Sequence, residues 1–140
     1  MIAILWLLAI WSYFTMPEII PVHFNGSGTA DSFGPRGSIF ILPAVGTLVF
    51  GLLTLLNKVP HVFNYPAAIT PENAEAHYTN ATRMLRYMKL SICVLFIVLV
   101  FFTMQTAKGN TNGLGVWFMP FILGIVFIPI VVSVFKARKI

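Results

Sequence analysis

The stretch PEIIPVHFNGSGTADSFGPRG, residues 17–37, lies between two apolar runs and decides how the chain is threaded. It holds two of the four acidic residues, one of the three histidines, His23, and four of the ten glycines. Residues 20–24, IPVHF, favour a strand, and residues 25–28, NGSG, are typical of a turn. We therefore predict a short hairpin or compact turn that connects two helices at a membrane surface.

The composition indicates an integral membrane protein. Hydrophobic residues make up 58% of the chain and charged residues 9%, whereas a soluble domain has about 25% charged residues. So few charges cannot cover a soluble globule. The 140 residues predict one membrane domain, residues 1–140. The basic clusters flank apolar runs, so they are topology signals and not a nucleic-acid interface.

Four apolar runs are candidates for membrane-spanning helices, which need about 20 residues, with a usual range of about 17–25. The first run is the shortest. We therefore predict an all-α integral membrane protein whose four transmembrane helices span approximately residues 2–16, 38–56, 87–105 and 116–135.

The positions of the basic residues predict the orientation. Four basic residues lie between the second run and the first turn of the third, namely Lys58, Arg83, Arg86 and Lys89. The C-terminal segment has three, whereas residues 17–37 and the connection between the third and fourth runs have one each. We therefore expect both termini and residues 57–86 to lie in the cytoplasm and residues 17–37 to lie outside.

The predicted cytoplasmic loop contains the start of a helix. Thr70-Pro71-Glu72 provides an N-cap residue, a proline at the first helical position and an acid in the first turn. We expect this helix to continue without a break into the third span, as an amphipathic cytoplasmic extension. Basic residues here attract anionic lipid or a partner, and the candidates are Arg83, Arg86 and Lys89.

The stretch MPEIIPVHFNGSGTADSFGPRGS resembles the signature of a bacterial and archaeal membrane family, domain of unknown function 1648. The family pattern is loosely Leu-Pro-Asp-x-Ile-Pro-x-His-Phe-Asn-x-x-Gly-x-Pro-Asp. The departures are mild, with methionine for leucine, glutamate for aspartate and alanine for the later proline. The matching residues are Pro17, Ile20, Pro21, His23, Phe24, Asn25, Gly28 and Asp31.

A second segment, FNYPAAITPENAEAHYTNATRMLR, resembles one that is common in small members of the same family. The domain also forms the first part of the sporulation-delaying-protein immunity family, whose members protect a cell from a secreted toxic peptide. This chain lacks the second half of those proteins. The resemblance implies a bacterial cytoplasmic (inner) membrane protein, with other membrane subunits or a secreted peptide as partners.

Ionisable residues are sparse and none lies in the middle of a span, which favours a non-enzymatic membrane module of the receptor, immunity or accessory-subunit type. We predict no cofactor and no catalytic residue. The family motif is more specific than a turn requires, so it predicts an outer recognition site. Its candidate residues are His23, Asn25, Asp31 and Arg36.

Two other classes of function remain open. The first is a small transporter or lipid-handling protein, because four kinked helices can form a lateral groove. The second is a metal-dependent membrane enzyme, for which His23 and Asp31 are weak candidate ligands. A catalytic zinc site usually has three protein ligands. The predicted topology separates this pair from the remaining candidates, His61, Glu75 and His77, by a bilayer core of about 30 Å.

Overall fold

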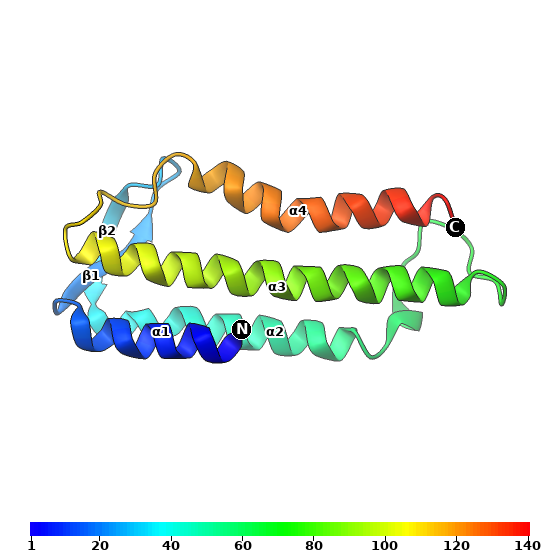
Figure 1. The fold of residues 1–140 in the computed structure, drawn as a ribbon, viewed down its shortest axis with the longest axis horizontal. Coiled ribbons are helices and arrows are strands. Elements are labelled where there is room, and N and C mark those ends of the chain that lie inside the picture. Colours follow the sequence, from blue (N-terminus) through cyan, green and yellow to red (C-terminus); the bar gives the residue numbers. More distant parts are fainter.

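A computed structural model describes all 140 residues, which form an elongated helix bundle with a small sheet at one end (Figure 1). Consecutive helices run antiparallel to one another. In chain order the elements are α1 (Ile2–Thr15), β1 (Ile19–Phe24), β2 (Ala30–Pro35), the 3₁₀ helix η1 (Arg36–Phe40), α2 (Ile41–Leu56), the 3₁₀ helix η2 (Pro60–Val62), α3 (Ala74–Ala107) and α4 (Phe118–Ala137).

Three helical segments are long and apolar enough to cross a membrane: η1 with α2 (Arg36–Leu56), α3 and α4. The predicted span at residues 2–16 corresponds to α1, an apolar helix of 14 residues that is shorter than these three. At about 1.5 Å per residue it is about 21 Å long, whereas a bilayer core is about 30 Å thick. In Figure 1, α1 covers only the half of the bundle nearest the sheet.

Helix α3 is the centre of the bundle. Helices α1, α2 and α4 each pack against it, and α2 and α4 hardly touch one another. Half of the residues of α4 are exposed, and all of these except Lys136 are apolar. Apolar side chains around a whole helix indicate contact with lipid, so the bilayer is the solvent of this bundle.

The most tightly packed interior lies near the sheet. Leu5 and Ala9 of α1 are completely buried, and so is Val100 of α3. The Trp6 indole donates a 3.0 Å hydrogen bond to Thr47 Oγ1 of α2. These contacts explain how a short α1 is held in place. The buried cluster consists of Leu5, Ala9, Met16, Ile20, Ile39, Val100 and Met104.

The connection between α1 and α2 is an antiparallel hairpin, in which β1 pairs with β2 from Ile19 opposite Pro35 to Phe24 opposite Ala30. The register shifts on either side of His23, which indicates bulges. Such irregularities change the direction of single side chains. The predicted hairpin is therefore present as two short strands, and β1 is the strand that contacts α3.

The predicted helix start at Thr70 is three residues early, because α3 begins at Ala74 with Asn73 as its N-cap residue. The Thr70 amide donates to Asn73 Oδ1 at 2.9 Å, and the amides of Asn73 and Ala74 donate to the Thr70 carbonyl. A hydrogen bond from the Thr70 side chain also lowers the pKa of the exposed Glu72 carboxyl. The helix then runs unbroken for 34 residues, as expected.

The two ends of the bundle differ in charge. The hairpin end comprises the hairpin and residues 108–117, and the opposite end comprises the α2–α3 connection, the first half of α3 and the C-terminal residues (Figure 1). Two acidic and two basic residues lie at the hairpin end, and two acidic and seven basic residues lie at the opposite end. The formal net charge of +5 therefore belongs entirely to the opposite end.

Candidate functional site

His23 and Asp31 lie on the two strands of the hairpin and contact each other. His23 Nδ1 is 2.5 Å from Asp31 Oδ1. The side chains are 66% and 42% exposed, so water screens the pair and its contribution to stability is small, at most about 1 kcal/mol. Both groups therefore remain accessible to a ligand.

Asn25 holds the turn of the hairpin together. Its Oδ1 accepts hydrogen bonds from the amides of Ser27 and Thr29, both at 3.0 Å, and from the Ser27 hydroxyl at 2.7 Å. Asparagine often stabilises turns in this way. Its oxygen is therefore committed to the turn, and any contact with a ligand must use its side-chain nitrogen.

The tip of the hairpin packs against the connection between α3 and α4. The Leu114 amide donates to the Gly28 carbonyl at 2.7 Å, and Thr29 forms an isolated antiparallel bridge with Gly113. A Cβ atom at Gly113 would lie 2.1 Å from the Gly28 oxygen, and one at Gly28 would lie 2.4 Å from the Gly115 oxygen. The close approach of these two glycine-containing segments therefore fixes the hairpin over the end of α3 and the start of α4.

A cavity of about 350 Å³ lies beneath the hairpin, between β1, α2, α3 and α4. Ligand pockets typically range from about 300 to 1,000 Å³ and combine apolar walls with a few polar groups. Eleven of the sixteen lining residues are hydrophobic. The polar side chains that line it are His23, Asn25, Ser38 and Thr103.

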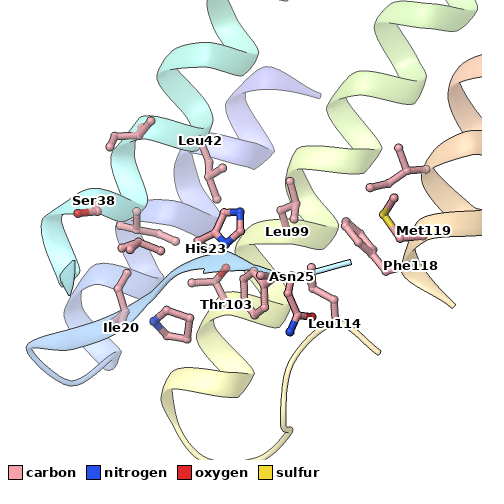
Figure 2. Close-up of a pocket in the computed structure, with 16 residues that line it drawn as sticks. Ile20, His23, Asn25, Ser38, Leu42, Leu99, Thr103, Leu114, Phe118 and Met119 are labelled. Atoms are coloured by element: carbon pink, nitrogen blue, oxygen red, sulfur yellow. The ribbon is translucent and has the colours of Figure 1, made fainter. Parts of the chain in front are cut away.

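Figure 2 shows how the polar groups are placed in this cavity. The His23 ring lies near Leu42 of α2 and Leu99 of α3, and Phe118 and Met119 of α4 project from the other side. Because α2 and α4 hardly touch, no helix packing closes the space between them. The cavity therefore has a polar edge at the hairpin and apolar walls between the helices.

Arg36 does not join the other three hairpin candidates. Its guanidinium lies over the Tyr13 ring of α1, 4.8 Å from the centroid, and it does not line the cavity. Lys108 makes a similar contact with Trp11, at 5.2 Å. Aromatic and basic side chains of this kind are typical of membrane–water interfaces, so Arg36 helps to position the end of α1.

The structure also separates the three basic candidates on α3. Lys89 Nζ donates to Thr54 Oγ1 of α2 at 3.2 Å and lies 5.1 Å from the Phe50 ring centroid. Arg83 instead lines a second hollow, with Lys136 and Lys139. Arg86 is exposed and does not line that hollow. The three residues therefore do not form one site.

The candidate metal ligands lie at opposite ends of the bundle. His23 and Asp31 belong to the hairpin, whereas His61 and His77 belong to the opposite end (Figure 1). No group of three or more histidine, cysteine, aspartate or glutamate side chains could hold a metal ion. His23 and Asp31 are therefore a pair of candidate ligands that the other candidates do not join.

His77 is a buried residue of α3 at the opposite end. It is 1% exposed, and neither ring nitrogen has a hydrogen-bond partner. Its ring meets the edge of Tyr65, with 5.7 Å between centroids. Burial, and then the neighbouring Tyr78, raise the pKa of the Tyr65 phenol, which donates to the Pro60 carbonyl at 2.8 Å. His77 therefore belongs to an aromatic cluster that holds the α2–α3 connection on α3.

Several residues of the site could not be identified from the sequence. Thr103, Leu114 and Met119 line the cavity, but each lies in or beside an apolar run that looks like an ordinary span. The one usable signal was the sequence Gly113-Leu114-Gly115, because closely spaced glycines indicate close approach of another backbone.

Residues 1–47 match the family model described as Domain of unknown function (DUF1648). The resemblance to this family is therefore confirmed, and the matched segment contains α1, the hairpin and the first part of α2. His23, Asn25 and Asp31 all lie inside it. The description assigns no activity to the domain.

A curated relative also matches part of the chain. An uncharacterized protein of Archaeoglobus fulgidus is 38% identical over 74 residues, which is 47% of this chain. The match spans 40% of the length of that relative. No solved structure matches the chain significantly. Both comparisons therefore show similarity to proteins without an assigned activity.

Proposed function

We propose that the chain is a non-enzymatic membrane module that binds an amphiphilic ligand at its hairpin end. The cavity beneath the hairpin carries this proposal, because it combines eleven hydrophobic residues with the polar edge formed by His23 and Asn25. A ligand with a polar head and an apolar tail matches both parts. A receptor or immunity role fits this arrangement when the ligand is a secreted, membrane-active peptide, and an accessory subunit would present the same surface to a partner.

A second candidate function is lipid handling. It is favoured by the gap between α2 and α4, which hardly touch. In a membrane this gap faces the lipid chains. A single acyl chain can enter sideways, and its head group then meets His23 and Asp31, whose side chains offer hydrogen-bonding groups to a phosphate and an ammonium group.

The test compares two probes on the purified full-length chain. Native mass spectrometry follows titration with lysophosphatidylethanolamine or with a cationic amphipathic peptide. Saturable binding of the peptide supports the receptor role, and saturable binding of the lipid supports lipid handling. If neither probe binds saturably, the cavity is not an amphiphile site.

His23→Ala should weaken binding of the preferred probe roughly tenfold, because a hydrogen bond to a charged group contributes about 1.5–3 kcal/mol. The matched control is His61→Ala, which removes an exposed histidine at the opposite end. Thermal unfolding should be unchanged in both variants. Equal weakening by the two substitutions would contradict a role of the hairpin.

We also propose that the hairpin end lies outside the cytoplasm of a bacterial cell and that the C-terminus lies inside. The charge distribution supports this orientation, because basic residues are enriched in cytoplasmic segments. The first residues of α1 lie part-way along the bundle and its last residues lie at the sheet (Figure 1). For α1 we therefore propose only that it runs toward the outer side.

Cysteine labelling tests this orientation. In a Cys93→Ser background, Ser27→Cys and Ala67→Cys each place one thiol at an exposed position, at opposite ends. A membrane-impermeant reagent added to intact cells should label position 27 alone. Labelling at position 67 alone would show that the protein has the opposite orientation.

A further inference from the structure

The opposite end of the bundle has its own hollow, of about 250 Å³, between the first turns of α3 and the last turns of α4. Its basic lining residues come from both helices, with Arg83 on α3 and Lys136 and Lys139 at the end of α4. Thr79 and Asn80 supply the polar remainder. Five of its seven lining residues are therefore polar or basic, and Ala76 and Ile140 complete the lining.

A hydrogen-bonded contact holds the two walls of this hollow together. Asn80 Nδ2 donates to the Ser133 carbonyl at 2.9 Å and to Ser133 Oγ at 3.0 Å. Arg83 and Lys136 each follow this contact by three residues. The two helices are therefore fixed where the basic side chains emerge, so that the hollow does not depend on long side chains alone.

None of these three basic side chains lies within ion-pair distance of a carboxylate. The one such contact in the protein, between His23 and Asp31, lies at the other end of the bundle. Three like charges around one hollow repel each other, and an anion relieves that repulsion. Arginine and lysine together suit a phosphate, because the guanidinium presents a fork of donors and lysine adds a point charge.

The place of the hollow identifies the source of the phosphate. The apolar sequence of α4 ends at Phe135, immediately before Lys136, and Val132 and Phe135 are exposed beside it. The proposed orientation puts this hollow at the cytoplasmic membrane surface, where basic pockets between helices bind lipid head groups. We propose that Arg83, Lys136 and Lys139 bind the phosphate of an anionic phospholipid, whose chains lie along α4. This site is independent of the ligand at the hairpin end.

The test measures retention of phosphatidylglycerol by the full-length chain in native mass spectrometry, with phosphatidylcholine as the zwitterionic reference. Arg83→Ala with Lys136→Ala and Lys139→Ala should weaken phosphatidylglycerol binding roughly 100-fold, at about fivefold per basic residue near a membrane surface. Phosphatidylcholine binding should not change. Arg83→Lys should keep most of the affinity, because it retains the charge.

The matched control is Arg86→Ala with Arg138→Ala. These residues carry the same charge on the same two segments, but neither lines the hollow. The control should lose at most a few-fold in affinity. If the control and Arg83→Ala with Lys139→Ala lose equal affinity, attraction is diffuse and the site is overturned. Complete competition by millimolar inorganic phosphate would also overturn it, by showing a site for soluble phosphate.

Discussion

Gly113→Ala is expected to destabilise the protein by about 2–5 kcal/mol and to release the tip of the hairpin. The added Cβ would lie 2.1 Å from the Gly28 carbonyl oxygen, which belongs to the backbone and cannot rotate away. Gly113 also has a positive φ of 140°. Overpacking typically costs about 1–3 kcal/mol, and a backbone conformation that disfavours side chains adds about 1–2 kcal/mol.

Substitutions at two other glycines separate the steric cost from the cost of the backbone conformation. Gly109 has a φ of +74° and open space around it, so Gly109→Ala measures the backbone term alone, about 1–2 kcal/mol. Gly26 has neither a positive φ nor a close neighbour, so Gly26→Ala should change stability by less than about 0.5 kcal/mol. Thermal unfolding in detergent gives all three values. If Gly113→Ala lowers the stability only as much as Gly109→Ala does, the contact between Gly113 and Gly28 is not formed.

Met119→Trp is expected to weaken ligand binding at the hairpin end at least tenfold. Met119 lines the cavity, and the larger indole would occupy space that the apolar tail needs. Each excluded methylene group costs about 0.8 kcal/mol, so exclusion of two groups already gives about tenfold. The binding constant is measured by titration with lysophosphatidylethanolamine or the amphipathic peptide.

The control for this substitution is Leu123→Trp, one turn further along α4. Leu123 is 52% exposed and does not line the cavity, so the same indole there should leave the affinity unchanged. Thermal unfolding of both variants shows whether the fold is intact. Unchanged affinity in Met119→Trp would contradict the location of the ligand.

Local patterns in the sequence were enough to predict most helices and the hairpin. The apolar runs at 38–56, 87–105 and 116–135 correspond to the three long helices, because length and hydropathy are local properties. The NGSG turn gave the hairpin for the same reason. The run at residues 2–16 corresponds to the shorter apolar helix α1, and its crossing of the membrane stays a prediction.

The candidate site was harder to predict, because it depends on packing between distant segments. The sequence motif identified His23, Asn25 and Asp31, and two of these line the cavity. It did not identify the apolar walls, which come from β1, η1, the three long helices and the α3–α4 connection. The sequence also did not group Arg83 with Lys136. These residues are brought together by the contact between Asn80 and Ser133, which are 53 residues apart in the chain.

The most direct test of the amphiphile site is the position of a photolabel. A lysophosphatidylethanolamine with a diazirine in the middle of its chain is bound to the protein in nanodiscs, irradiated and mapped by peptide mass spectrometry. The proposal predicts saturable labelling of cavity residues, above all Leu99, Met119 and Ile122. Unsaturable labelling spread over the exposed face of α4, at Leu123, Phe127 and Ile128, would contradict it.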